Sequence, residues 1–565
     1  MMHQTVFDTS EIFRLLGVEQ VIICPGSRNA PLTISFVQNL GIKKVSVVDE
    51  RSAGFIAIGI AQATGKPVVV CCTSGSAVLN FAPACAEAFY QEVPVIFLSA
   101  DRPPEWIDQG DGQTIRQSNV LSPHVKANYD LPVDLSHTDA QWEYQRKLND
   151  AVNTANSGVK GPVHVNIPFR EPFYPKDLDQ YQFSEKLPVR TVLEGTATPL
   201  DSQERSEVFR DWMQYSKRLF VLGQDEYDEK FLYALNKISL SHHIPIVADV
   251  ISNANNLKGI ITKQDLFLAD PAVAESLKPD LVITFGKTLI SKNLKIALRK
   301  DLDHWTIGSH RPLDTFRNLR KVISWNPVAF LELVETTGPQ PAEYQVLWQS
   351  VEKATDLHLQ GAVNAQSFSE FWVFKELMAK IPARSHVHLS NSMAVRYANF
   401  LAPKQKHITF HCNRGTSGID GPVSTAVGFA STSDQMNILI TGDLSALYDR
   451  NAFLNDLSPN LKIIVSNNCG GGIFDLIPGP KVLAAQDRKQ YFETRHDLSF
   501  ARFADEIQFD YFLINDKIGL QSQLESFLKS KKNGLMEIQT KAEINGEVYR
   551  KVKGYLKEKS PFGDS

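Results

Sequence analysis

Short runs of apolar residues, separated by segments with helical spacing, constrain the fold of this chain more than any other feature of its sequence. In the first third of the chain such runs lie at residues 21–24, 45–48, 68–72, 95–98 and 163–167. A strand that is apolar on both faces must be covered on both faces, which is the environment of a parallel sheet between helices. Between these runs, residues 53–63 carry apolar side chains at the spacing of a helix. The pattern therefore predicts an α/β domain.

The same alternation recurs twice further along the chain. A second series of apolar runs lies at residues 219–222, 244–248, 281–285 and 322–325. A third lies at residues 387–389, 408–410, 438–441, 463–465, 512–514 and 535–538. Proline-containing segments at residues 172–199 and 336–341 separate the series, and we interpret the first as a linker. We therefore expect three doubly wound parallel-sheet domains, at residues 1–180, 200–335 and 345–565.

Composition excludes several classes of protein and partner. The 59 basic and 63 acidic residues give a net charge of −4, so the chain as a whole does not attract nucleic acid or anionic membranes. The six cysteines are too few for a disulfide framework and show no C-x-x-C spacing. The chain has no apolar run near the roughly 18 residues of a membrane helix, and its start does not resemble a secretory signal. We expect a cytoplasmic protein with no nucleic-acid or membrane partner.

Polar residues follow two strands of the third predicted domain. Asp443 comes after the run at 438–441, and Asn468 comes after the run at 463–465 and precedes the glycines at 470–472. Ligands of open parallel sheets bind at the carboxyl ends of strands. Carboxylate, amide and backbone carbonyl oxygens suit Mg²⁺, which is usually shared with a phosphate or diphosphate. For either motif alone, a helix cap or a turn is the favoured explanation. The pair, separated by one strand–helix–strand crossover, favours a metal site.

This pair resembles the diphosphate and metal signature of thiamine-diphosphate enzymes, in which Gly-Asp is followed after about 25 residues by Asn-Asn. The resemblance implies thiamine diphosphate as cofactor, and Mg²⁺ (or Mn²⁺) bound by Asp443, Asn468 and the carbonyl of Gly470. It also implies that the first domain binds the aminopyrimidine and the third binds the diphosphate.

The family also requires a glutamate in its first domain, and Glu50 lies at the expected strand end. A carboxylate that is hydrogen-bonded to N1′ of the aminopyrimidine favours the imino tautomer, whose 4′-imine removes the thiazolium C2 proton. The alternative is that Glu50 only complements a helix N-terminus. With Asp443 and Asn468 present, we predict the catalytic role.

Further motifs narrow the resemblance. The matching stretches are residues 24–28, 49–54, 100–105, 113–117, 391–396, 413–421 and 442–449. They are similar to the 2-succinyl-5-enolpyruvyl-6-hydroxy-3-cyclohexene-1-carboxylate (SEPHCHC) synthases of menaquinone biosynthesis, which carry Gly-Asp-Leu-Ser where other relatives have a glycine in place of Leu444. The match covers the first and third domains, and the middle domain matches weakly. It implies decarboxylation of 2-oxoglutarate and 1,4-addition of the resulting carbanion to isochorismate.

Both substrates carry two carboxylates, which guanidinium groups bind bidentately. The resemblance implies a substrate pocket of Ser27, Arg28, Arg102, Gln113, Lys292, Ser392, Arg396, Arg414, Phe474 and Ile477. It implies further cofactor contacts from Ser392, Ile419, Leu444, Ser445, Ile473 and Phe474, with Ile419 wedged beneath the cofactor. Asn293 stands where the family often has a second cation. The alternatives are solvated surface arginines and ordinary apolar core residues. We interpret Arg51 and Arg116 as structural ion-pair partners.

Other functions remain open at this point. A different thiamine-diphosphate 2-oxoacid decarboxylase or carboligase would share Glu50, Asp443 and Asn468 but would lack the arginine set. A non-catalytic nucleotide-binding protein would have lost the cofactor residues, and a nicotinamide oxidoreductase would need a glycine fingerprint that is missing after the first strand of the middle domain. Because active sites of the family lie between subunits, the resemblance implies a homodimer or homotetramer.

Overall fold

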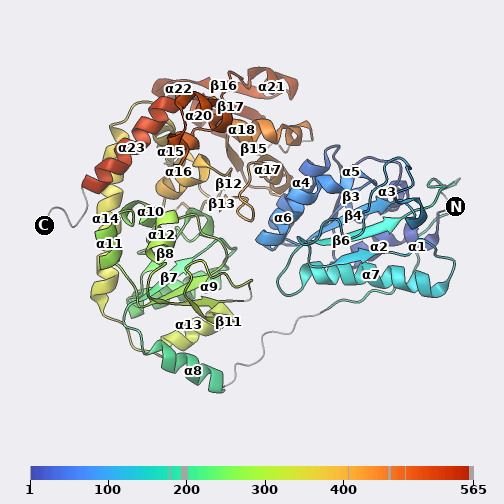
Figure 1. Ribbon diagram of the computed structural model, residues 1–565, viewed down its shortest axis with the longest axis horizontal. Coiled ribbons are helices and arrows are strands. Elements are labelled where there is room, and N and C mark those ends of the chain that lie inside the picture. The colour runs from blue at the N-terminus through green and yellow to red at the C-terminus, as the bar shows by residue number, and fades with distance from the viewer. Residues whose placement is uncertain are drawn as a thin grey trace. The chain divides into compact units, whose positions relative to one another are not determined.

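The computed structural model describes residues 2–558 except residues 176, 179, 193–201, 309, 405, 456–457, 459 and 477–478. The chain forms two compact units. The first unit comprises residues 1–194, 413–437 and 445–461, and the second comprises residues 195–412, 438–444 and 462–565 (Figure 1). No helix in the described part of the chain is long and apolar enough to cross a membrane.

The first unit contains a parallel sheet in the order β2-β1-β3-β4-β6-β5. Its strands are β1 (Gln20–Ile23), β2 (Lys43–Ser46), β3 (Val68–Cys72), β4 (Val95–Asp101), β5 (Asn128–Asp130) and β6 (Val163–Pro168). Its helices are α1 (Gln4–Phe7), α2 (Thr9–Leu15), α3 (Ala30–Gln38), α4 (Glu50–Thr64), α5 (Ser76–Asn80), α6 (Ala82–Gln91) and α7 (Thr138–Asn156). The predicted apolar runs correspond to every strand except β5, whose polar residues lie at the sheet edge.

Helices cover the central strands of this sheet. Phe13 of α2, Phe36 of α3 and Leu148 of α7 pack in one core with Val69 and Ile96 of the sheet. Helices α4 and α6 contact β3 and β4 outside that core. Helix α17 (Pro422–Ala430) also belongs to the first unit and lies beside α4 (Figure 1). The parallel order places the carboxyl ends of all the strands along a single edge.

The described part of the predicted linker is packed against the first sheet domain. The ring of Phe183 stacks on Phe7 at 4.7 Å, and the Ser184 hydroxyl donates to Asp8 at 2.7 Å. Further along, the backbone N–H of Arg190 donates to the Asn149 side chain at 2.7 Å. The segment therefore lies along the domain as far as Val192, and residues 193–199 fall outside the described residues.

The second unit contains two parallel sheets. The central sheet has the order β11-β10-β9-β7-β8, formed by β7 (Arg218–Leu222), β8 (Ile246–Ala248), β9 (Leu281–Phe285), β10 (Asp303–Ile307) and β11 (Leu319–Ile323). The third sheet has the order β13-β12-β14-β15-β17-β16, formed by β12 (His386–Leu389), β13 (Thr409–His411), β14 (Asn437–Gly442), β15 (Leu461–Asn467), β16 (Asp510–Ile514) and β17 (Gly534–Gln539). The apolar runs predicted these strands except β10, in which polar and apolar residues mix, and the run at 322–325 overlaps only the last two residues of β11.

Helices pack around both sheets. Those of the central sheet are α8 (Ser202–Trp212), α9 (Glu229–His242), α10 (Gln264–Phe267), α11 (Pro271–Ser276), α12 (Lys292–Ala297) and α13 (Pro327–Glu335). Those that follow along the chain are α14 (Ala342–Asn364), α15 (Glu370–Lys380), α16 (Met393–Leu401), α18 (Asp443–Tyr448), α19 (Ile473–Leu476), α20 (Ala485–Arg488), α21 (Ala501–Glu506), α22 (Lys517–Lys529) and α23 (Ala542–Glu558). Three parallel α/β sheet domains are thus observed, in agreement with the predicted fold class.

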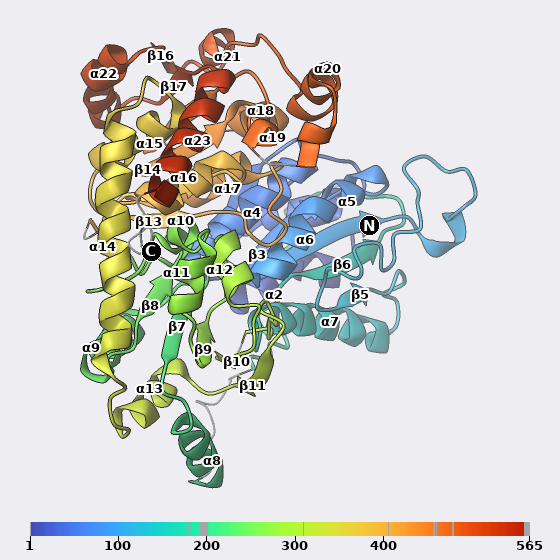
Figure 2. The same cartoon turned by 60° about the vertical axis from the view of Figure 1, so that its left-hand side comes forward.

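Helix α14 joins the two domains of the second unit. Its Tyr344, Trp348 and Val351 are buried in a core with strands of the central sheet. Further along, it lies beside α23 of the third domain (Figure 2). One helix therefore contributes to the packing of both domains.

Candidate functional site

The carboxyl edge of the third sheet brings the predicted metal ligands together. Asp443 follows β14 and Asn468 follows the adjacent strand β15. The Asp443 carboxylate is buried and accepts hydrogen bonds from the backbone N–H of Gly470 at 2.9 Å and of Leu444 at 2.7 Å. Burial raises the pKa of Asp443 above its ordinary value. Residues separated by 25 positions in the sequence thus meet in one site.

The side chain of Asn468 has one satisfied end and one open end. Its Nδ2 donates to Oε1 of Glu370 at 2.7 Å. Its Oδ1 is buried and accepts no hydrogen bond from the described residues. Buried polar atoms without a partner are rare in native proteins, and an amide oxygen is an Mg²⁺ ligand. Beside the Asp443 carboxylate, this orphaned oxygen fits a divalent cation.

The glycine turn after Asn468 needs residues without side-chain obstruction. Gly470 has φ +146°, and a Cβ there would lie 2.6 Å from the backbone oxygen of Glu493. The N–H of Gly471 donates to that same oxygen at 2.6 Å. The segment that follows brings Nε2 of His496 to 3.3 Å from the Asp443 carboxylate. The turn is therefore packed against residues 493–496, a contact that the sequence did not indicate.

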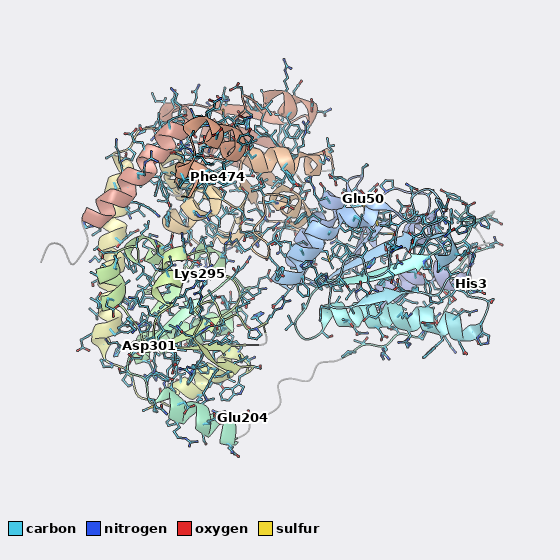
Figure 3. The ribbon with its side chains drawn as sticks, in the orientation of Figure 1. His3, Glu50, Glu204, Lys295, Asp301 and Phe474 are labelled. Atoms are coloured by element: carbon cyan, nitrogen blue, oxygen red, sulfur yellow. The ribbon has the colours of Figure 1, made fainter. Side chains whose placement is uncertain are left out.

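The predicted apolar wall begins directly after this turn. Ile473 and Phe474 are the first residues of α19 and are half-buried, and the ring of Phe474 meets the Phe492 ring edge-on at 5.5 Å. Phe474 is labelled in Figure 3. Ile477 lies outside the described residues.

Two further predicted residues lie at the start of α16 of the third domain. Ser392 has φ +74° and precedes the helix, and the Arg396 guanidinium donates to the Ser392 carbonyl at 2.5 Å. The strand before this helix, β12, pairs within the sheet next to β14, and Ser390 accepts a hydrogen bond from Gly442 at 3.2 Å. Ser392 and Arg396 thus lie at the same sheet edge as Asp443.

Lys292 of the central domain directly follows a buried polar junction between that domain and α16. The Asp249 carboxylate accepts from the Ser291 N–H at 3.0 Å and from Nδ2 of Asn399 on α16 at 3.2 Å. Oδ1 of Asn399 in turn accepts from the Val250 N–H at 2.7 Å. Lys292 directly follows Ser291 and is exposed. One network therefore connects the helix that carries Arg396 with the turn that carries Lys292.

Asn293, which stands where the family often has a second cation, has a structural contact. Its N–H and its side-chain amide donate to Asp265 Oδ1 and to the Asp265 carbonyl, each at 2.7 Å. Burial raises the pKa of Asp265 to about 6. Asn293 is thus engaged in positioning the start of α12.

In the first unit, Glu50 begins α4. Asp49 caps this helix, accepting from the N–H groups of Arg51 at 2.9 Å and Ser52 at 3.4 Å. Glu50, labelled in Figure 3, is half-buried, and its pKa is raised chiefly by burial and further by the Asp49 charge. A carboxylate at a strand end with a raised pKa is suited to proton chemistry.

The other predicted residues of this domain lie in turns along the same edge. Ser27 and Arg28 follow β1, and Arg28 is 4% exposed, donates to the Phe169 carbonyl at 2.9 Å and forms no ion pair with a described carboxylate. Arg102 follows β4 and pairs with Asp111 at 2.9 Å. Gln113 is exposed, with φ +53°, and its backbone adjoins the turn after β3.

Arg414 and Ile419 lie in a loop of the first unit that a buried glutamate holds. The Glu87 carboxylate of α6 accepts from the N–H groups of Gly415 at 2.8 Å and Thr416 at 2.6 Å. The Ile419 carbonyl accepts from the Ser445 hydroxyl at 2.9 Å, and the Ile419 side chain is 38% exposed. A large apolar side chain with this exposure is available for contact with a ligand.

Arg51 and Arg116 take the structural roles that we predicted. Arg51 donates to the Tyr448 carbonyl at 2.8 Å and lies 3.9 Å from Asp449, and Arg116 pairs with Asp108 at 2.8 Å.

Sequence reasoning missed the acidic residues that hold these sites, namely Glu87, Asp249 and Glu370. Each lies 40 or more positions from the backbone or side chain that it holds, and none belongs to a motif. Only the tertiary fold could have identified them.

Comparison with known proteins agrees with the geometry. Residues 9–120 match the family described as thiamine pyrophosphate enzyme, N-terminal TPP binding domain. A 2-succinyl-5-enolpyruvyl-6-hydroxy-3-cyclohexene-1-carboxylate synthase of Cytophaga hutchinsonii is 41% identical over 98% of this chain and 99% of its own. Proteins of the same name from Flavobacterium johnsoniae and Porphyromonas gingivalis are 39% and 34% identical, covering 97% of this chain and 97% and 96% of theirs.

Proposed function

Because the chain belongs to the SEPHCHC synthase family of thiamine pyrophosphate enzymes, we propose that it decarboxylates 2-oxoglutarate and adds the resulting four-carbon unit to isochorismate in a 1,4 sense. The products are 2-succinyl-5-enolpyruvyl-6-hydroxy-3-cyclohexene-1-carboxylate and CO₂, in menaquinone biosynthesis. The observation that carries the proposal is the open Oδ1 of Asn468 beside the Asp443 carboxylate, in a chain of this family.

In this proposal Asp443, Asn468 and the carbonyl of Gly470 hold Mg²⁺ or Mn²⁺, and the ion binds the cofactor's diphosphate. Bound thiamine diphosphate supplies a nucleophilic carbon and accepts the electron pair left by decarboxylation. Glu50 binds N1′ of the aminopyrimidine through its carboxylate and adjusts the proton on that ring. The remaining cofactor contacts come from Ser392, Ile419, Leu444, Ser445, Ile473 and Phe474.

We assign the recognition of the substrate carboxylates to the cationic set. Its members are Arg28, Arg102, Lys292, Arg396 and Arg414, with Ser27, Gln113, Ser392, Phe474 and Ile477 completing the pocket. The burial of Arg28 supports this assignment, because its printed contacts, the Phe169 carbonyl and the Phe173 ring at 4.4 Å, carry no full negative charge and an anionic ligand would compensate the guanidinium. The exposed position of Lys292 leaves its ammonium group free to meet a carboxylate.

The proposal includes an assembly and a location. We infer a homodimer or homotetramer whose active sites combine the aminopyrimidine domain (1–180) of one subunit with the diphosphate domain (345–565) of another, in the cytoplasm. The second candidate is another thiamine-diphosphate decarboxylase or carboligase, which would use Glu50, Asp443 and Asn468 in the same way.

One assay separates the two candidates. The purified protein is incubated with thiamine diphosphate, Mg²⁺, 2-oxoglutarate and isochorismate, and the loss of isochorismate and the mass of the product are followed. We expect turnover that requires both substrates. Turnover equally good with pyruvate in place of 2-oxoglutarate would favour the second candidate, and no turnover at all would contradict the assignment.

A further inference from the structure

We propose that Glu370 is a positioning residue for the metal site, because its carboxylate fixes the Asn468 amide in the orientation that leaves Oδ1 open to the cation. The inference rests on the proposed function, since it concerns the same predicted ion. It adds a residue that no sequence motif contains, and it explains why Asn468 is open at only one end.

The backbone of Glu370 is held firmly. Glu370 is the first residue of α15, and Ser369 before it caps the helix by accepting from the Trp372 N–H at 3.4 Å. The N–H of Glu370 donates to Oδ1 of Asn545 on α23 at 2.9 Å. The side chain is 4% exposed. Its carboxylate therefore occupies a defined position behind the end of β15.

One oxygen of this carboxylate accepts hydrogen bonds from two side chains, one within β15 and one directly after it. Oε1 accepts from the Ser466 hydroxyl at 3.0 Å and from Nδ2 of Asn468 at 2.7 Å. An ionised carboxylate only accepts hydrogen bonds, so it binds the NH₂ end of an amide and repels the oxygen end. Asn468 can therefore present only Oδ1 on its far side.

The neighbouring asparagine shows that the open oxygen is specific to Asn468. Nδ2 of Asn467 donates to Oε1 of another buried carboxylate, Glu537, at 2.8 Å. Oδ1 of Asn467, however, accepts from the Cys469 N–H at 3.0 Å. Two adjacent asparagines thus make the same amide–carboxylate bond, and only that of Asn468 leaves a buried acceptor unused. This contrast distinguishes a ligand-facing amide from a structural one.

The local charge also favours a cation. Among the described residues, no basic side chain forms an ion pair with Glu370, and the basic group near Asp443 is His496 at 3.3 Å. Two buried carboxylates in one region are costly unless positive charge compensates them. A divalent ion between Asp443 and Oδ1 of Asn468 supplies that charge, and Glu370 acts on it through the amide.

The test measures metal affinity rather than turnover. Apoprotein is titrated with Mn²⁺ at saturating thiamine diphosphate, and free Mn²⁺ is followed by electron paramagnetic resonance. We expect Glu370→Ala to raise the Mn²⁺ Kd about 10–100-fold, the usual cost of losing an outer-sphere partner. Glu370→Asp, which withdraws the acceptor, should raise it by about tenfold. Glu370→Gln keeps an acceptor oxygen at the same reach but loses the charge and can also donate, so its Kd should lie between those of the wild type and Glu370→Ala.

Glu537→Ala is the matched control. It removes a buried carboxylate from the neighbouring strand and the bond to Asn467, so it should lower the Tm while leaving the Mn²⁺ Kd unchanged. If Glu370→Ala does not fold, Glu370→Asp carries the test.

The experiment distinguishes failure of the proposed cofactor site from failure of the role of Glu370. Wild-type protein that binds no Mn²⁺ in the presence of thiamine diphosphate would overturn the proposed cofactor site itself. Wild-type binding with an unchanged Kd in Glu370→Asp and Glu370→Ala, or an equal loss in Glu537→Ala, would overturn the role of Glu370 alone.

Discussion

Single buried carboxylates hold the residues that the proposed chemistry needs. Glu87 accepts backbone N–H groups beside Arg414, Asp249 accepts the N–H before Lys292, and Glu370 accepts the amide of Asn468. Hydrogen bonds to charged groups contribute about 1.5–3 kcal/mol each, so these contacts can fix a loop in one conformation. The sequence identified the held residues through motifs, but their carboxylate partners lie in distant segments and show no local pattern.

Glu50→Gln tests the role of the predicted catalytic residue. The amide keeps the size of the side chain but cannot exchange a proton with the aminopyrimidine, so we expect kcat to fall about 10²–10⁴-fold. Deuterium exchange at C2 of the bound cofactor should slow in parallel, while Mn²⁺ binding with thiamine diphosphate stays at the wild-type level. Exchange at the wild-type rate would exclude Glu50 from this role.

The raised pKa of Glu50 adds a pH dependence to the same prediction. Burial disfavours the carboxylate, so protonation occurs at higher pH than for an exposed glutamate. When the pH is lowered, wild-type kcat/KM should therefore begin to decline at a higher pH than the one at which an exposed glutamate becomes protonated.

At the scale of helices and strands, the periodicity of the sequence predicted most elements because buried parallel strands are apolar throughout. The run at 68–72 coincides with β3, and that at 281–285 coincides with β9. The strands β5 and β10 escaped prediction because they contain polar residues such as Asn128, Asp130 and His304. Which helices pack together was beyond local patterns, and the pair α4–α17 is the clearest example.

Gly59→Ala tests that helix pair. A Cβ at Gly59 would lie 2.0 Å from the Thr425 carbonyl oxygen, and one at Gly428 would lie 2.1 Å from that of Ile56. Helix backbones rather than mobile side chains meet here, so the helices must separate. We expect a loss of about 1–3 kcal/mol in the free energy of unfolding, seen as a lower Tm.

Gly361→Ala is its control. Gly361 lies within α14, and a Cβ there meets nothing within 4 Å. Replacing it should stabilise the protein by up to about 1 kcal/mol, because alanine favours the helix. Equal Tm values for the two variants would contradict the close packing of α4 on α17.

At the scale of the whole molecule, residues that follow strands of the central domain form hydrogen bonds with the third domain. Within the central domain, the turns after β7 and β9 are in close contact. The N–H of Gly223 donates to the Phe285 carbonyl at 2.9 Å, and a Cβ at Gly223 would lie 2.3 Å from the Lys287 carbonyl oxygen. The central domain's hydrogen bonds to the third domain include the junction of Asp249 with Asn399 and the paired bonds between Asn253 and the Phe410 backbone.

Asn399→Ala tests this junction. The variant loses the bonds to Asp249 and to the Val250 N–H, so Lys292 and Arg396 are no longer held by one network. We expect kcat/KM for at least one substrate to fall by about tenfold or more, because small misplacements of binding groups are costly. The affinity for thiamine diphosphate and metal should not change.

Gln340→Ala is the matched control. This variant also removes a buried amide, which accepts from the Arg218 N–H at 2.9 Å and donates to the His243 carbonyl at 3.0 Å. Gln340, however, contacts the start of β7, at the opposite end of that strand from the turn at Gly223. The variant should lower the Tm without altering kcat/KM. A similar kcat/KM loss in both variants would show that the junction has no particular role.

The sequence by itself determined the fold class and the family resemblance and singled out Glu50, Asp443 and Asn468 as candidates, because strand periodicity and short motifs are local properties. Only the tertiary structure decided that Asn468 has one open oxygen, that Asn293 binds Asp265 and that the Glu370 carboxylate accepts from the Asn468 amide. These facts depend on which distant segments meet at a sheet edge. Hydrogen-bond partners there are set by packing in three dimensions and leave no periodic trace along the chain.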